Sequence, residues 1–208
     1  TDIIFKMSNL GFLSKASFVN SKNGKDIITG NFLMKKGNNR ITALFDYKNN
    51  EIIINKANLK STFSDGAATG KIMFSPFFVF DLDLDLNSIN FTKLYNYFLS
   101  LDEKEQIKFF KINNKINGRL NLSSERIYSS FNLVKSLEAR LQFNNGNILV
   151  EQFLFNLGKL GAADLLGEIN NDKKFTNFKY ESNIFIDNQK KFLGKFGIYN
   201  KQSIPSNL

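Results

Sequence analysis

Three carboxylates, Asp81, Asp83 and Asp85, form the densest polar group with a spacing that suits chemistry. Side chains two apart in a strand share a face and lie about 6.5 to 7 Å from each other. That spacing suits the carboxylate pair of a glycosidase or the oxygen ligands of calcium. A glycosidase pair flanks a cleft, however, and a calcium loop needs turns and carbonyl oxygens. We therefore interpret these residues as a solvated strand face and expect no metal site.

Two further groups of residues have a possible chemical role. Lys93, Tyr95 and Tyr97 contain the groups of a Tyr/Lys acid–base pair, but they fall in a helical stripe that we expect to pack on a sheet. The glycines suggest a phosphate loop, but Gly70-Lys71 is followed by Ile72 rather than by Ser or Thr. Turns, bulges or close sheet packing are a better explanation for the four glycines, Gly66, Gly70, Gly161 and Gly167.

The composition excludes several classes of enzyme. The chain of 208 residues contains no histidine and no cysteine, which removes thiolate nucleophiles, disulfides, Ser-His-Asp triads and the usual zinc sites. We expect no catalytic residue and no cofactor. The net charge of +9 fits either a codon bias toward Lys, Asn, Ile and Phe or an anionic partner. The basic residues are scattered without an RNA-binding signature, so we expect no nucleic acid.

Alternation with a period of two predicts that strands make up most of the chain. Phe78, Phe80, Leu82, Leu84 and Leu86 alternate with the three carboxylates, and the segment from Leu137 to Phe143 alternates likewise. A weaker run extends from Ile41 to Tyr47. Turn signals such as Asn49-Asn50 and Asn145-Gly146 separate these runs. The pattern predicts a mostly β, antiparallel fold.

One segment has helical spacing. Phe91, Leu94, Tyr95, Phe98 and Leu99 form one stripe, which Asn90 or Ser88 can cap. Asp102 and Glu105 resemble a capping box for a second short helix that ends near Phe110. We predict a single helical insertion over residues 90–110.

An internal repeat divides the chain. An Asn-rich turn precedes a Gly-Ala-Ala sequence twice, and 17 positions separate Asn49 from Gly66 and Asn144 from Gly161. We predict a first β-unit over residues 1–110, ending in the helix, a second unit over residues 111–199, and a tail over residues 200–208. Tandem units usually stack so that neighbours bury each other's apolar faces.

Several segments resemble the AsmA-like family of bacterial envelope proteins, relatives of TamB. They are Asp65–Ile72, Phe80–Leu86 and Leu141–Ile148, with Gly161 and Gly167 downstream. The resemblance implies an elongated, curved β-sheet with an apolar groove, and a role in moving phospholipid between the inner and outer membranes to support outer-membrane biogenesis. It also implies a periplasmic location, phospholipid acyl chains and other envelope proteins as partners, and an inner-membrane anchor outside this segment. A groove needs no catalytic group, because it only keeps acyl chains out of water.

We predict a groove lined in both units by nine residues: Phe78, Phe80, Leu82, Leu84, Leu86, Leu141, Phe143, Ile148 and Val150. Two alternatives remain, a structural or adhesive β-repeat that binds other proteins and a polysaccharide-active enzyme that uses Asp or Glu. The alternation alone cannot distinguish an open groove from a closed core, because both need one apolar face on each strand.

Overall fold

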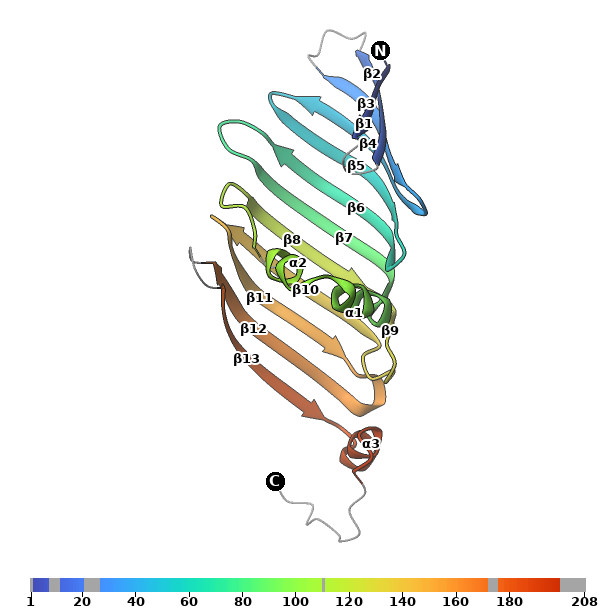
Figure 1. Ribbon diagram of the computed structural model, residues 1–208, viewed down its shortest axis with the longest axis vertical. Coiled ribbons are helices and arrows are strands. Elements are labelled where there is room, and N and C mark those ends of the chain that lie inside the picture. Colours follow the sequence, from blue (N-terminus) through green and yellow to red (C-terminus); the bar gives the residue numbers. More distant parts are fainter. Residues whose placement is uncertain (1, 8–11, 21–26, 110, 172–175, 199–208) are drawn as a thin grey trace.

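The alternating runs form strands of one long, curved sheet that does not close on itself (Figure 1). The computed structural model describes residues 2–7, 12–20, 27–109, 111–171 and 176–198. Twelve strands follow one another across the sheet, and a short thirteenth, β9, pairs with β7. The prediction of a mostly β, elongated and groove-like sheet with a short helical insertion is confirmed.

The sheet is arranged in chain order. Its strands are β1 (Asp2–Met7), β2 (Phe12–Asn20), β3 (Ile28–Lys36), β4 (Asn39–Lys48), β5 (Glu51–Lys60), β6 (Ser64–Met73), β7 (Val79–Asn90), β8 (Asn117–Ser124), β9 (Ile127–Tyr128), β10 (Ser136–Asn144), β11 (Asn147–Asn156), β12 (Gly161–Asn171) and β13 (Thr176–Ile186). The helices are α1 (Phe91–Ser100), α2 (Glu103–Phe109), the short 3₁₀ helix η2 (Gly158–Leu160) and α3 (Gln189–Lys195).

Most neighbouring strands are joined by hairpins. Two-residue turns join β4 to β5 and β10 to β11, and their residues have positive φ angles: 53° and 63° at Asn49 and Asn50, 50° and 85° at Asn145 and Gly146. Such turns match the twist of the flanking strands. The pairing of β7 with β8 is the exception, because these strands run parallel. A parallel pair needs a crossover, and α1 and α2 provide it.

The helix signals predicted α1 and α2 correctly, with one omission elsewhere. The side chain of Asn90 accepts a hydrogen bond from the backbone N–H of Lys93 at 2.9 Å. Asp102 and Glu105 form the reciprocal capping box, with bonds of 2.8 and 3.1 Å. The predicted helical insertion is confirmed, but the prediction did not include α3, which follows β13 and is capped by Asn188.

The register gives the sheet two different faces. Paired residues share a face, and one row across the sheet reads Ala16, Phe32, Ala43, Ala57, Ala68 and Leu84. The neighbouring row on the opposite face contains Lys15, Thr42, Asn58 and Asp85. Bulges interrupt the register in β5 after Ile54 and in β11 after Val150. Bulges increase the local twist and bend a strand, which suits a strongly curved sheet.

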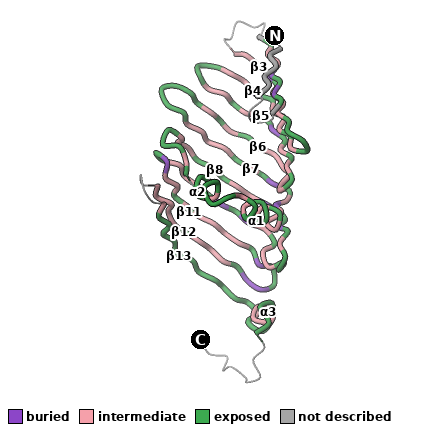
Figure 2. Tube along the Cα trace, viewed as in Figure 1, coloured by how far each residue is buried: buried purple, intermediate pink, exposed green. Residues whose placement is uncertain are grey.

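A small core lies where the crossover leaves the sheet. Leu86, Ile89, Ile127 and Leu137 are buried together, with Phe91 packed against them. Elsewhere most described residues are half-buried or exposed (Figure 2). The apolar face is therefore largely uncovered.

The register also corrects the alignment of the repeat. Gly70 pairs with Ile54 just before the bulge in β5, and Gly167 pairs with Val150 just before the bulge in β11. Gly70 and Gly167 are therefore equivalent positions. Gly66 and Gly161 are not, because Gly66 lies four residues before Gly70, whereas Gly161 lies six residues before Gly167. The boundaries at residues 110 and 199 stay a prediction, since one sheet runs through both units and the tail lies outside the described residues.

Candidate functional site: an apolar groove

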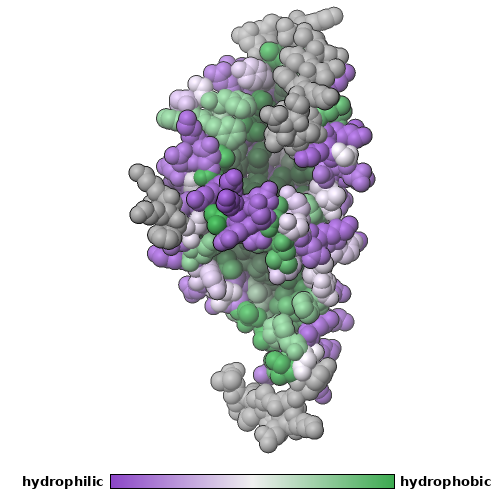
Figure 3. All heavy atoms as spheres, in the orientation of Figure 1, coloured by the Kyte–Doolittle hydropathy of each residue, from purple (hydrophilic) through white to green (hydrophobic). Residues whose placement is uncertain are grey.

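The apolar face forms a groove of about 720 Å³ over β2 to β7. Its lining residues are all aliphatic or aromatic, and the one hydroxyl among them, on Tyr47, donates to Asn50 Oδ1 at 3.1 Å. The volume is typical of a site for a small organic ligand. The groove therefore offers a ligand apolar contact and almost no hydrogen bonding. Figure 3 shows apolar side chains in the hollow on either side of the hydrophilic crossover.

The groove owes its depth to a row of small residues. Ala16, Ala43, Ala57 and Ala68 lie side by side across β2, β4, β5 and β6, with Phe32 of β3 among them. Larger side chains flank this row, including Phe45, Ile54 and Leu82. Small residues between large ones leave a trough that neighbouring side chains cannot fill. The sequence identified Ala43 and Phe45 only as part of a strand, although the alternation from Ile41 to Tyr47 was the available signal.

Leu82 and Leu84 lie in the wall of this groove. Phe80 lies at the start of β7 and Phe78 directly before it, with their ring centroids 6.3 Å apart. The ring of Phe80 also lies 5.3 Å from the ring of Phe143 in the second unit. Gly118 pairs with both Phe80 and Phe143 from the strand between them, so no side chain separates the two rings.

The remaining predicted residues continue the same rows into the second unit. Leu82 pairs with Leu120, which pairs with Leu141, which in turn pairs with Val150. Phe143 pairs with Ile148 in the next row. All of these side chains therefore lie on the face that carries the groove. Their contact with a ligand stays a prediction.

Leu86 differs from the other eight residues. Its side chain is 8% exposed and belongs to the packed core beneath the start of α1. The crossover covers the apolar face at this point, so Leu86 lies in a closed core and not in the open wall. The alternation is the same at Leu84 and Leu86, so the sequence held no signal for this difference.

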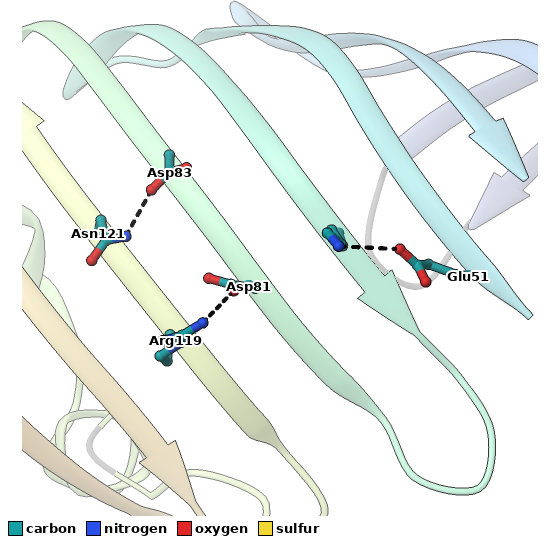
Figure 4. A network of polar contacts seen from close by, with 6 residues as sticks. Glu51, Asp81, Asp83, Arg119 and Asn121 are labelled. Atoms are coloured by element: carbon teal, nitrogen blue, oxygen red, sulfur yellow. Dashed lines mark hydrogen bonds and ion pairs between the residues drawn. The ribbon is translucent and has the colours of Figure 1, made fainter.

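The three carboxylates lie on the opposite face, where each accepts a hydrogen bond from β8; Figure 4 shows the bonds of Asp81 and Asp83. Asp81 is bound by Arg119, Asp83 by Asn121 and Asp85 by Ser123, each at 2.7 Å. This ladder connects the two units across their parallel pair. It is a strand surface, and Asp83 and Asp85 also line a shallow depression of about 300 Å³ together with Glu138 and Arg140 of β10. No three acidic side chains in the described ranges are grouped to hold a metal ion.

The prediction that the α1 stripe packs on the sheet was wrong in most of its length. None of its residues is buried, and Tyr95 is 62% exposed. Phe91 packs on the core, and the ring of Tyr97 lies 5.3 Å from that of Phe63. The helix serves as the crossover between parallel strands, so it contacts the core through Phe91 and the segment before β6 through Tyr97. Lys93 does not line the surface depression that Tyr95 and Tyr97 share.

The glycines serve close packing between strands. A Cβ at Gly70 would strike the backbone carbonyl oxygen of Asp81, and one at Gly167 would strike that of Lys179. Gly66 and Gly161 meet backbone atoms of β7 and β13 in the same way. All four lie in strands, with no loop that could surround a phosphate.

The chain matches no protein-family model, no curated protein and no solved structure. Over the part of the chain that the structure describes, no helix is both long enough and apolar enough to cross a membrane.

Proposed function

We propose that the chain binds phospholipid acyl chains in the apolar groove and conducts them along it, as a segment of an AsmA-like envelope protein between the inner and outer membranes. The observation that carries the proposal is the open apolar groove over β2 to β7, whose rows of apolar residues continue in register through β8 and β10 to β11. Each methylene kept out of water contributes about 0.8 kcal/mol, so an acyl chain is a suitable occupant.

The residue patterns that resemble the AsmA-like family support the same proposal. In this view the protein acts in the periplasm, with an anchor outside this segment, and supports outer-membrane biogenesis without catalysis or a cofactor. Phe78, Phe80, Leu82, Leu84, Leu141, Phe143, Ile148 and Val150 would contact the acyl chains. A large apolar face that stays exposed normally marks an interaction site.

The test combines two variants with one lipid probe. A phospholipid with a diazirine on its acyl chain is photo-crosslinked to the protein, and thermal unfolding is followed in parallel. Leu84→Lys should abolish crosslinking while the protein still melts within a few degrees of the wild type, because a lysine in an open groove reaches water. Leu44→Lys is the matched control, since Leu44 lies on the opposite face and is 55% exposed.

Retained crosslinking in Leu84→Lys would contradict the proposal. Loss of the fold in that variant would also contradict it, because a buried unpaired charge unfolds a closed core.

The alternative function is a β-repeat that binds other proteins. One observation favours it: Tyr95 and Phe131, 62% and 73% exposed, line a second apolar depression outside the groove. Exposed aromatic residues are enriched where proteins bind each other. A protein-binding module of this kind would lose its partner after Phe131→Ser and keep it after Leu84→Lys.

A further inference from the structure

The charge of the strands changes sign along the sheet. The strands β2 to β5 carry seven Lys and Arg residues against two Asp and Glu residues, whereas the strands from β6 to β13 carry four against nine. Positive charge is therefore concentrated on β2 to β5, toward one end of the sheet (Figure 1). A local excess of cations attracts an anionic partner.

Three of these cations surround a depression of about 580 Å³ on the face opposite the groove. They are Lys15 of β2, Arg40 of β4 and Lys56 of β5, and the described residues that line the depression include no Asp or Glu. Strand spacing and register place the three backbones about 12–16 Å apart. Long, flexible side chains can bring charges at that separation onto one ligand between them.

The protein does not neutralise these cations itself. Within the described ranges, neither Arg40 nor Lys56 forms an ion pair. Asp46 lies on the same face of β4, but its two carboxylate oxygens accept hydrogen bonds from Thr29 and Asn55 at 2.8 and 2.9 Å. Arg40 and Lys56 can therefore bind an anion without first breaking a contact with a carboxylate.

The centre of the depression combines hydrogen-bonding and apolar side chains. Asn31 of β3 pairs with Leu44 of β4, and Leu33 pairs with Thr42, so polar and apolar residues alternate between the two strands. In the described part of the chain, the side chains of Asn31 and Thr42 bond to no other residue. A ligand here meets hydrogen-bonding groups together with an apolar surface, because Leu44 is 55% exposed.

We propose that this depression binds a phosphate monoester, with its phosphate on Lys15, Arg40 and Lys56 and its organic part over Leu33 and Leu44. A phosphate monoester carries about 1.5 to 2 negative charges at pH 7 and three acceptor oxygens, which suits three cations better than a singly charged carboxylate does. Arginine can also bind phosphate through two parallel hydrogen bonds. The same group occurs in soluble phosphate esters and in the headgroup of phosphatidic acid.

The site is independent of the proposed groove function. Lys15, Thr42 and Lys56 alternate along their strands with the groove residues Ala16, Ala43 and Ala57, so they lie on the other face of the sheet. A groove that binds no acyl chain would leave this proposal standing, and the reverse also holds.

The test titrates the full chain with two probes. Glycerol 3-phosphate is added to the ¹⁵N-labelled protein, and the amide resonances of Asn31, Leu33 and Thr42 are followed by NMR. We expect saturable shifts with a Kd in the millimolar range, because the cations are exposed to water. Glycolate, which carries a carboxylate in place of the phosphate, should bind about fivefold more weakly at the same ionic strength.

Vesicles form the second probe. Those of equal parts phosphatidic acid and phosphatidylcholine are sedimented with the protein, and pure phosphatidylcholine vesicles serve as the control. Saturable binding of glycerol 3-phosphate would assign the site to a soluble ester. Binding confined to the phosphatidic acid vesicles, and weakened by Arg40→Gln, would assign it to the lipid headgroup.

Three variants separate the site from general attraction by positive charge. Arg40→Gln and Lys56→Gln should each weaken the binding of the phosphate probe by about fivefold. Lys48→Gln is the matched control, because Lys48 is exposed on the same face of β4 and does not line the depression. Its Kd should stay within about twofold of the wild type. All three side chains are exposed, so each variant should melt within a few degrees of the wild type.

Several results would overturn the proposal. They are no binding of either probe, equal binding of glycolate, and equal weakening by Lys48→Gln and Arg40→Gln. Self-association in analytical ultracentrifugation that Arg40→Gln abolishes would overturn it too, because the cations would then face the acidic strands of a second copy.

Discussion

Leu84 and Leu86 are neighbours on the same face of β7, yet shortening them should have different consequences. Leu86 is 8% exposed within the packed core, and Leu84 is half-buried in the wall of the open groove. Leu86→Ala removes buried methyl groups and leaves a cavity. Leu84→Ala only widens a space that is already open, so the free energy of unfolding suffers no additional loss from a new cavity.

The magnitudes follow from burial. Leu→Ala in a packed core costs about 2–5 kcal/mol, and we expect about 3 kcal/mol at Leu86. Half-burial of a leucine is worth about 1 kcal/mol, which is the expected loss at Leu84. For a chain of this size 1 kcal/mol shifts Tm by roughly 2–4 °C, so Leu86→Ala should lower Tm by about 6–12 °C and Leu84→Ala by about 2–4 °C.

Differential scanning calorimetry of the two variants, with and without phospholipid, measures both effects. Added lipid should raise the Tm of the wild type and of Leu86→Ala by similar amounts, and that of Leu84→Ala by less, because this variant has lost a wall contact. Equal losses of Tm at the two positions would refute the distinction between core and groove. An equal lipid-induced rise in all three proteins would refute the role of Leu84 in binding.

Further predictions concern the polar face and the junction of the units. Hydrogen bonds from Ser88 and Asn87 lower the pKa of Asp65, so the stability from this carboxylate is complete above about pH 5 and is lost as the pH falls through the lowered pKa. Asp65→Asn should therefore weaken the dependence of the urea denaturation midpoint on pH below about pH 5. Gly118→Ala should cost about 1–3 kcal/mol in urea unfolding, because φ is 149° and the new Cβ would strike the backbone carbonyl oxygen and then the ring of Phe80. A double-mutant cycle of Asp81 and Arg119 should give only about 0.2–1 kcal/mol and decrease with salt, since both side chains are exposed; a larger, salt-independent coupling would contradict this.

Local signals in the sequence predicted local structure well. Alternation from Phe78 to Leu86 and from Leu137 to Phe143 predicted strands, because a half-buried strand must alternate. Asn90 and the Asp102–Glu105 pair predicted helix starts, because their side chains bond to backbone within three residues. The same signal at Asn188 was available for α3 and was overlooked.

Long-range features could not be predicted in this way. The parallel pairing of β7 with β8 depends on where the crossover returns the chain, which no local pattern encodes. The repeat matched Gly66 with Gly161 as well as Gly70 with Gly167, but the register makes only the second pair equivalent, because spacing along the chain does not reveal how the strands pair. Likewise, the difference between the open wall at Leu84 and the closed core at Leu86 depends on the position of Phe91.

The stacking of strands in chain order has a mechanical consequence. Because β1 and β13 lie at opposite ends of the sheet, tension applied between them acts along the direction of the interstrand hydrogen bonds. Such a load separates one pair of strands at a time, because the hydrogen bonds of a pair break one after another. In shear loading, by contrast, all the bonds of a pair would have to break together. A segment of this kind would lengthen under modest force by peeling a strand from one end, and the strands that remain would keep their groove.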